Sequence, residues 1–464
     1  MEKRKPIPID EVDISTDMAG VYCSSPITIG SHDPDKPWYP ATSLARWVGL
    51  FKKYYEAGAG HLITPSIVPE PYEEPKEFFA HKGRRHFIGR WLPYHYRDWR
   101  GHRNIPAGYF WTGPTAIFIK KKEGADLVRG MVSEIDQDKC PIMGNVLVDI
   151  NSTNVDNWVE HSKWYEELGV KTLELNFGCP CGAFELPPGI PAEDVKFGML
   201  LGVMPNMIEM ITRAVVKETK IPVYVKITPE TGYPGIVMAA DAAIKGGAVG
   251  VVTTHMGFSV PPPDIYGDPP GKTPWPFMKS FPPATIGGPG ERFFMYKGVA
   301  YVHANFPTLD IEAGAGIVHP EHVVEAIFLG AKTAQAFSGI VWNGINFIKR
   351  TNEFLRTYMA ERGFRTIEDF RGSTIKNYFK PLELDDFIPS FAAVDQSRCI
   401  KCGICYNNWC PAISEENQTA TINPEECSGC AMCAMICPQG AIHMFEWGKK
   451  PVFKAGQPYS PYGM

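Results

Sequence analysis

The sequence predicts an α/β protein: a barrel of eight parallel strands, followed by a small cysteine-rich module of α+β type. Two observations indicate this division. Short apolar runs alternate with helical patterns over most of the 464 residues, and eight of the twelve cysteines lie between residues 399 and 437. Alternating strands and helices are typical of parallel α/β folds, and clustered cysteines at fixed spacing are typical of a metal site.

Eight apolar runs have the length and composition of buried strands. We expect strands at 26–30, 60–64, 145–150, 172–176, 222–227, 250–254, 309–313 and 333–336. Helical patterns lie near 43–57, 124–135, 155–168, 204–219, 235–246, 293–304 and 320–329, with another after 344. Eight strand–helix pairs predict a (β/α)8 TIM barrel. A doubly wound sheet is the alternative, but it would not need the eighth strand. Residues 10–21 predict a small additional strand pair.

Two connections in the barrel, 65–123 and 255–290, are too long for simple turns. Within the first, residues 81–103 carry seven Lys or Arg against one acidic residue, interleaved with Trp and Tyr, and the second is crowded with prolines. Long loops in compact domains are usually functional, and loops that follow strand C-termini form the active sites of such barrels. We expect the basic loop to lie over the active site; an ordinary surface loop is the alternative.

The chain divides by composition into three parts. Residues 1–362 form the barrel with its two long loops, 363–393 form a polar linker, and 394–464 form the cysteine-rich domain and a short tail. The net charge of −5 argues against nucleic-acid binding. An N-terminus without an apolar run, the lack of an apolar stretch of about 18 residues, and few cysteines outside the module predict a cytoplasmic protein without a membrane span.

The cysteines form two C-x2-C-x2-C runs, each closed by a further Cys-Pro, which is the ligand pattern of two 4Fe–4S clusters. In two-cluster ferredoxins the closing cysteine of each run binds the other cluster. The first predicted set is Cys399, Cys402, Cys405 and Cys437, and the second is Cys427, Cys430, Cys433 and Cys410. The first run has four residues before its closing cysteine where three are usual. Zinc is the alternative, but it needs two pairs of thiolates per site.

The segments 13–20 and 173–182, the latter reading L-E-L-N-F-G-C-P-C-G, resemble the dihydroorotate dehydrogenase superfamily. The closer similarity is to the C-terminal half of dihydropyrimidine dehydrogenase, an FMN barrel with a ferredoxin domain, and it covers nearly the whole chain. The resemblance implies that Asn176 binds flavin or substrate and that Cys179 is the general acid/base. A thiol with a pKa near ~8.5 can be tuned for that role. Cys181 is a substitute, a partner or a buried filler.

The resemblance also assigns the flavin-binding residues. Lys226, at the end of an apolar strand, is expected to approach flavin N1/O2 and to stabilise the anionic reduced flavin. Glycine-rich segments and a serine are expected to bind the phosphate, as loops after strands seven and eight commonly do. These phosphate residues are Gly287, Gly288, Gly314, Gly316, Ser338 and Gly339.

Three departures from the family concern the substrate. Thr64-Pro65-Ser66 stands where the family has a lysine, His255-Met256 stands where pyrimidine-metabolising relatives have Asn-Thr, and the F-x-N substrate stretch is not recognisable in the basic loop. The substrate is therefore expected not to be a simple pyrimidine. His255 is expected at a strand's C-terminal end, where it is either a catalytic residue or a hydrogen-bonded loop residue.

The sequence thus predicts an FMN- and iron–sulfur-dependent oxidoreductase that acts on a carbon–carbon bond conjugated to a carbonyl. The basic and aromatic loop predicts an anionic, planar substrate or a docking face for an acidic partner. Electrons are expected from a partner flavoprotein or a ferredoxin, in a homo- or hetero-oligomer. The alternative is an electron-transfer and docking subunit whose barrel is not catalytic.

Overall fold

The computed structural model describes residues 4–32, 44–69, 90–97, 104–112, 119–148, 154–179, 201–271 and 284–453. The chain forms two compact units, Met1–Phe379 and Lys380–Met464. Residues 363–379, predicted as linker, therefore belong to the first unit. Phe370 explains why, because its side chain is fully buried and its ring lies against that of Phe328 at a centroid distance of 4.9 Å.

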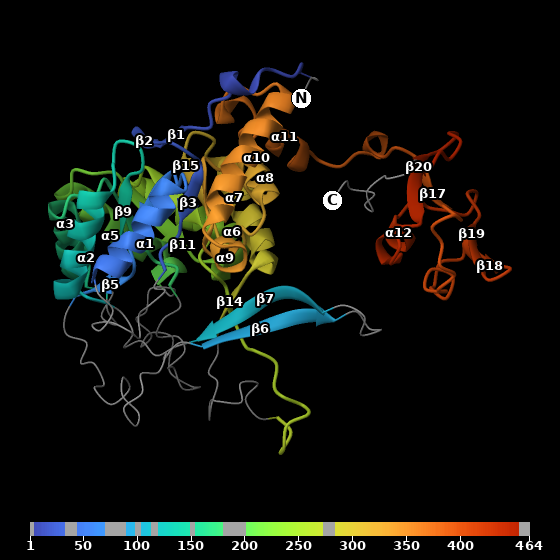
Figure 1. The fold of residues 1–464 in the computed structure, drawn as a ribbon, viewed down its shortest axis with the longest axis horizontal. Coiled ribbons are helices and arrows are strands. Elements are labelled where there is room, and N and C mark those ends of the chain that lie inside the picture. Colours follow the sequence, from blue (N-terminus) through green and yellow to red (C-terminus); the bar gives the residue numbers. More distant parts are fainter. Residues whose placement is uncertain are drawn as a thin grey trace. The chain divides into compact units, whose positions relative to one another are not determined.

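Eight parallel strands close into a barrel in the first unit (Figure 1). They are β3 (Ile27–Ile29), β4 (His61–Ile63), β9 (Ile142–Val146), β10 (Thr172–Asn176), β11 (Val223–Ile227), β12 (Gly250–Thr253), β15 (Asp310–Gly314) and β16 (Thr333–Gln335). Each strand pairs in parallel with the next, and β16 pairs with β3 to close the ring. The predicted fold class, a TIM barrel followed by a ferredoxin-like region, is confirmed.

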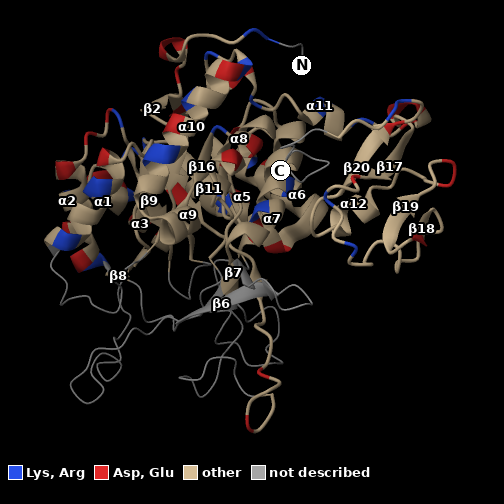
Figure 2. Cartoon of the chain, turned by 45° about the vertical axis from the view of Figure 1, so that its right-hand side comes forward, with Lys and Arg blue, Asp and Glu red and all other residues tan. Residues whose placement is uncertain are grey.

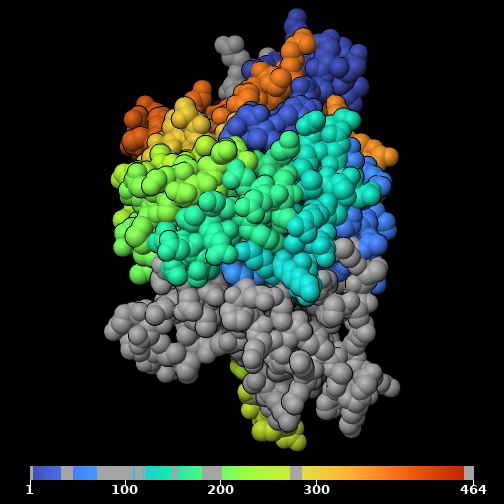
Figure 3. Space-filling model, turned by 90° about the vertical axis from the view of Figure 1, so that its left-hand side faces the viewer, coloured from blue at the N-terminus to red at the C-terminus, as the bar shows by residue number. Residues whose placement is uncertain are grey.

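Helices follow the strands and cover the barrel. They are α1 (Leu44–Glu56), α2 (Lys121–Glu134), α3 (Val155–Glu167), α5 (Pro205–Glu218), α6 (Gly232–Gly246), α7 (Arg292–Asn305), α8 (Pro320–Phe328), α9 (Phe337–Asn343) and α10 (Asn346–Arg362). Their apolar faces pack on the strands, while charged side chains lie on their outer faces (Figure 2). Figure 3 shows α3 and α5 side by side on one face, as their contacts require. Among the described residues, no helix has the length and apolar character to cross a membrane.

The third barrel strand differs from the prediction, since it spans Ile142–Val146 rather than 145–150. Gly144 and Asn145 are poor strand formers, so the sequence pattern does not show where this strand begins. In the structure Gly144 lies against the ring of Tyr165, where an added Cβ would fall 2.7 Å from Cγ. The close approach of α3 to the sheet therefore requires this glycine.

The two long loops contribute a second sheet that the sequence did not predict. Its four strands are antiparallel, in the order β13 (Phe258–Ser259), β14 (Ala284–Gly287), β7 (Asn104–Thr112) and β6 (Arg90–Arg97). The hairpin of β6 and β7 comes from the first loop and pairs with β14 of the second at one end of the barrel (Figure 1). Of the basic stretch 81–103, only the backbone of β6 lies within the described residues.

Shorter elements complete the first unit. β5 (Ile67–Val68) and β8 (Ile119–Lys120) extend the parallel sheet beside β9, while β1 (Thr16–Met18) and β2 (Val21–Cys23) form an antiparallel pair, as predicted for residues 10–21. The remaining helical turns are η1 (Ile9–Glu11), η6 (Pro229–Thr231), η7 (Pro289–Glu291), η8 (Ile367–Asp369) and α11 (Ile375–Tyr378).

The second unit contains two strand pairs and one short helix. The elements are η9 (Leu384–Asp386), β17 (Ser390–Val394), β18 (Ile413–Glu416), β19 (Thr419–Ile422), α12 (Met432–Ile436) and β20 (Ile442–Glu446), with β17 antiparallel to β20 and β18 to β19. Its core consists of small residues, two isoleucines and cysteines. So thin an apolar core supplies little stabilisation, and domains of this size usually depend on metal or disulfide crosslinks.

Candidate functional site

A cleft of about 520 Å³ opens at the C-terminal ends of the barrel strands. Residues that end or directly follow five strands line it, together with Tyr109 of β7 and Gly288 after β14. Polar side chains at this end of a parallel barrel are the usual place for chemistry. The cleft is therefore the candidate active site.

The structure brings half of the ten predicted barrel-site residues to this cleft. Those that line it are Lys226, His255, Gly288, Gly316 and Ser338. Those that are not part of its lining are Asn176, Cys179, Gly287, Gly314 and Gly339. Two of the latter are explained by packing, because a Cβ on Gly314 would fall 2.7 Å from the carbonyl oxygen of Thr254, and one on Gly339 would meet the ring of Phe347.

Asn176 and Cys179 lie where β10 ends. Asn176 is buried in register with Lys226, and its Oδ1 accepts a hydrogen bond from the backbone N–H of Gly178 at 3.2 Å. This bond shapes the turn that leads to Cys179. The Cys179 side chain is buried in a small apolar cluster with Val68 and Leu147. Cys181 lies outside the described residues.

His255 follows β12 and packs against the turn after β10. Its backbone N–H donates to the carbonyl of Ile227 at 2.9 Å, and its Cβ would lie 2.6 Å from a Cβ added to Gly178. Burial, reinforced by the charge of Lys226, lowers the pKa of His255 to about 3. The imidazole is therefore neutral at physiological pH, and it can offer one donor and one acceptor but no positive charge.

Below the cleft, Lys226 is the centre of a buried polar network. Its Nζ donates to Glu174 Oε1 at 3.3 Å and to Gln335 Oε1 at 3.1 Å. The amide of Gln335 donates in turn to Glu174 Oε2 at 3.2 Å and to Glu312 Oε2 at 2.9 Å. Gln335 thereby links two carboxyl groups, from opposite sides of the barrel interior, to one lysine.

Both glutamates in this network are fully buried. Burial raises the pKa of each carboxyl group, and the charge of Lys226 lowers it only in part. Thr28 donates a hydrogen bond to Glu312, and His61 Nε2 lies 3.4 Å from the same carboxyl group. Because burial lowers the pKa of His61 to about 3, Lys226 is the only charged base that this network contains among the described residues.

The glutamates are functional candidates that the sequence reasoning missed. Glu174 belongs to the motif at 173–182, and Glu312 precedes the glycines at 314 and 316, but neither is predicted as a site residue. An available signal was the position of an acidic residue inside an apolar strand, Leu-Glu-Leu in β10 and Ile-Glu-Ala in β15. A buried carboxyl group of this kind is a candidate for a functional site.

Two further carboxyl groups hold the loop that follows His255. Glu291 Oε2 accepts from the backbone N–H of Gly257 at 3.1 Å, and Glu230 Oε1 accepts from that of Phe258 at 2.7 Å. Glu291 is only 2% exposed. Burial, with the nearby charge of Glu230, raises the pKa of Glu291 to about 7.

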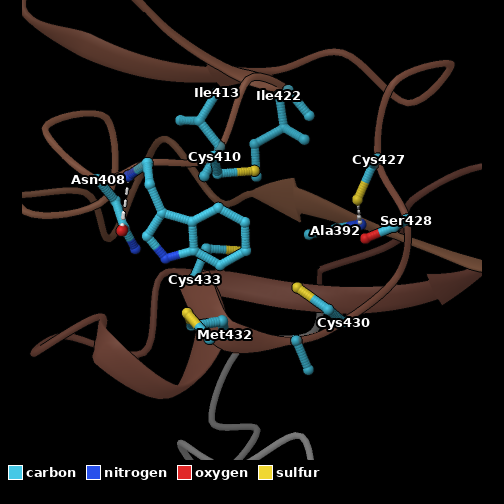
Figure 4. Close-up of a pocket in the computed structure, with 13 residues that line it drawn as sticks. Ala392, Asn408, Cys410, Ile413, Ile422, Cys427, Ser428, Cys430, Met432 and Cys433 are labelled. Atoms are coloured by element: carbon cyan, nitrogen blue, oxygen red, sulfur yellow. Dashed lines mark hydrogen bonds between the residues drawn. The ribbon is translucent and has the colours of Figure 1, made fainter.

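In the second unit the eight module cysteines surround two cavities. A cavity of about 340 Å³ is lined by Cys399, Cys402, Cys405 and Cys437. The other, of about 410 Å³, is lined by Cys410, Cys427, Cys430 and Cys433 and is drawn in Figure 4. These are the two predicted sets, each combining three thiols of one run with the closing thiol of the other.

In each set the four thiols lie around a cavity and do not converge on one position, as the ligands of a single metal ion would. Among the described residues no three His, Cys, Asp or Glu side chains are arranged to hold one metal ion. In a 4Fe–4S cube each thiolate binds a different iron, so four thiols around a cavity are suited to a cluster. Backbone N–H groups of Ala392 and Ala441 donate to the sulfurs of Cys427 and Cys437, at 3.4 and 3.2 Å, and such bonds stabilise thiolate charge.

The second unit also matches a family model. Residues 420–443 match the 4Fe-4S binding domain. With the barrel and its polar cleft, this match defines the class of protein: an iron–sulfur protein whose barrel has the place and polarity of an active site.

Relatives narrow the class. The chain is 25% identical over 327 residues to the NAD-dependent dihydropyrimidine dehydrogenase subunit PreA of Escherichia coli K12, covering 68% of this chain and 74% of that protein. It is 27% identical over 241 residues to the catalytic subunit of dihydroorotate dehydrogenase B (NAD(+)) of Thermoplasma volcanium, covering 51% and 69%. It is 26% identical over 253 residues to the chloroplastic dihydropyrimidine dehydrogenase (NADP(+)) of Arabidopsis thaliana, covering 51% and 53%.

These relatives are all dehydrogenases, and two of them are named as subunits of a larger enzyme. The chain is accordingly an iron–sulfur oxidoreductase. Its predicted resemblance to dihydropyrimidine dehydrogenase and the dihydroorotate dehydrogenase superfamily is confirmed.

Proposed function

We propose that the protein is an FMN- and 4Fe–4S-dependent oxidoreductase that acts on a carbon–carbon bond conjugated to a carbonyl. The observation that carries this proposal is the convergence of Lys226 with Gly288, Gly316 and Ser338 on one cleft. These residues come from four separate strand ends, and the family resemblance assigns all of them to flavin binding. Their convergence on one cleft is expected of a nucleotide site.

The residues of the cleft fit FMN. Ala315 and Gly316 have consecutive positive φ values of 88° and 77°, so left-handed backbone lines this part of the cleft. Gly316 also has no room for a side chain, because a Cβ would fall 2.3 Å from the backbone nitrogen of Arg292. Ser338 adds a hydroxyl group, and Lys226 adds a cation at the other side.

FMN, when bound, supplies hydride transfer. Lys226 would hold the polar edge of the flavin ring, and Glu174 and Gln335 fix its ammonium group at 3.3 and 3.1 Å. The glutamates also offset the lysine charge, so this chain offers less stabilisation to an anionic reduced ring than an isolated lysine would. Asn176 positions the turn that carries Cys179.

Cys179 and His255 are the proposed proton-transfer residues. His255 lines the cleft but is neutral, because its pKa is about 3. It is suited to accepting or donating a hydrogen bond to substrate. The Cys179 thiol remains the proposed general acid/base, since a thiol has an ordinary pKa of ~8.5, close enough to neutrality for proton exchange.

The electron-transfer subunit with a non-catalytic barrel is the second candidate function. One observation favours it: Cys179 packs in an apolar cluster and is not part of the cleft lining. In this alternative the clusters and the barrel surface serve a partner enzyme, and the cleft need not turn over a substrate.

In the second unit we propose two 4Fe–4S clusters, held by the two cysteine sets that line separate cavities. The clusters would exchange electrons with the flavin and with a partner flavoprotein or ferredoxin.

The basic loop supports an anionic, planar substrate or an acidic docking partner, because arginine pairs bidentately with carboxylates and phosphates. The assignment of residues 394–464 as a separate cluster-binding domain and the cytoplasmic location also remain proposals.

One measurement tests the proposal most directly. Protein purified without oxygen is denatured, and the released flavin and the iron are quantified beside a visible spectrum of the native protein. The expected result is about one FMN and about eight irons per chain. Protein with full iron but without flavin would overturn the enzymatic proposal and favour the electron-transfer subunit.

A further inference from the structure

Tyr109, from the hairpin of the first long loop, reaches the cleft. Its side chain is 4% exposed and lines the same cavity as Lys226 and Ser338. Its hydroxyl lies 2.9 Å from Ser338 Oγ and 3.7 Å from the sulfur of Met256. The family resemblance assigns no role to this residue, and the sequence reasoning treated its loop only as a cover.

Two glycines hold Tyr109 in this place. Tyr109 pairs with Gly287 in the register of β7 and β14, and a Cβ on Gly287 would fall 2.4 Å from Cζ of the tyrosine ring. A Cβ on Gly288 would fall 2.8 Å from Cα of Gly108. Gly287, predicted as a phosphate residue, therefore makes room for the tyrosine that occupies the cleft. The pairing of β7 with β14, two segments distant in sequence, therefore fixes the position of the Tyr109 ring.

The chemistry of this corner is suited to an anion. Burial raises the pKa of Tyr109 to about 12, so its hydroxyl stays protonated and can donate. One hydroxyl proton makes the bond between Tyr109 and Ser338, and the other can be offered to a third group. The thioether of Met256 is a weak acceptor, and a phosphate oxygen would replace it at a gain.

The backbone beside this hydroxyl pair has an unusual, left-handed conformation. Ala315 and Gly316, with consecutive positive φ, line the cleft together with Ser338. The two hydroxyl groups of Tyr109 and Ser338 can donate to a phosphate oxygen without a cationic side chain. The carboxyl groups of Glu174 and Glu312 lie below the cleft around Lys226 and Gln335. Glu291 is near enough to Tyr109 to act on its pKa, but burial disfavours the charged form of Glu291.

We propose that Tyr109 and Ser338 form a hydroxyl pair that binds the phosphate of FMN, so that β7 completes the nucleotide site. This inference rests on the proposed function, because it takes FMN as the ligand. It makes Tyr109 a phosphate-selective binding residue.

The test compares two flavins that differ only in the phosphate. Protein stripped of flavin, with its clusters retained, is titrated with FMN and with riboflavin, and dissociation constants are read from flavin fluorescence. Tyr109→Phe keeps the ring against Gly287 and removes only the hydroxyl. Since a hydrogen bond to a charged group is worth about 1.5–3 kcal/mol, FMN should bind about ten- to a hundredfold more weakly, and riboflavin should be unaffected.

Two further variants keep the test sharp. Ser338→Ala should show the same selective loss. Tyr266→Phe is the matched control, because that tyrosine is 93% exposed, and it should change neither constant.

An equal loss for both flavins would show that Tyr109 only supports the fold, and unchanged FMN binding would show that it does not touch the phosphate. Either result overturns the inference and leaves the proposed function standing. Wild-type protein that binds neither flavin would overturn the proposed function, and this inference with it.

Discussion

Glu291→Gln should change how stability depends on pH, because Glu291 is a carboxyl group buried where its charged form is disfavoured. Its Oε2 accepts a hydrogen bond from the backbone N–H of Gly257. Glu230 accepts one from the backbone N–H of the next residue, Phe258. Burial is the main cause that raises the pKa of Glu291 from 4.5 to about 7. Glutamine keeps the size of the side chain and its acceptor oxygen but has no charge at any pH.

The sign follows from proton binding. In the unfolded chain Glu291 loses its proton near pH 4.5, whereas in the folded protein it keeps the proton until about pH 7. The folded state therefore binds more protons between these values, and its stability falls as pH rises through that window. At about 1.4 kcal/mol per pKa unit, the loss amounts to about 3 kcal/mol once pH exceeds 7. Glu291→Gln has no titrating group at this position, so its unfolding free energy does not fall in this way.

The assay is guanidinium unfolding of both proteins at several pH values, followed by circular dichroism. Between about pH 5 and pH 8 the unfolding free energy of the variant should rise relative to wild type by about 2–3 kcal/mol. Glu361→Gln, on the exposed part of α10, is the matched control. A constant difference between Glu291→Gln and wild type across this range would refute the argument, since it would mean that Glu291 titrates alike in both states.

Three other substitutions follow from the structure. Cys410→Ala should lower the iron content from about eight to about four per chain, and an unchanged content would remove Cys410 from the ligands. Lys226→Met should keep the clusters but lose the flavin or its reducibility, whereas Cys179→Ala should keep a reducible flavin and lose turnover; near-normal turnover would exclude that thiol as the proton donor. Gly60→Ala should prevent barrel folding, as judged by circular dichroism, because its Cβ would lie 1.6 Å from a backbone carbonyl oxygen. Gly49→Ala, with open space around it, should fold normally.

Local sequence patterns predict much of the fold. The strand predicted at 172–176 agrees residue for residue with β10, and 222–227 and 250–254 agree within one residue with β11 and β12. Apolar runs of five residues flanked by turns leave few alternatives in a parallel sheet. The cysteine spacing likewise predicted which four thiols share a cavity, because a short loop can present only three of them.

Where local signals conflict, the prediction failed. The strand Ile142–Val146 contains Gly144 and Asn145, and its stability comes from packing against Tyr165 rather than from propensity. The hairpin of β6 and β7 lies in a stretch predicted as loop, because its basic and aromatic residues show no apolar alternation. Its partner strand β14 lies far along the chain.

The sequence by itself predicted the barrel, the two sets of four cysteines that line separate cavities and the family resemblance, since each depends on periodicity, spacing or a motif within a short stretch. The tertiary structure alone decided the composition of the cleft. Tyr109 reaches Ser338 only because β7 pairs with β14, and Glu312 meets Glu174 only through Gln335 inside the closed barrel. These contacts join residues that are distant in sequence, and no local pattern encodes which of them will meet. Closure of the barrel and pairing of the two long loops set those distances.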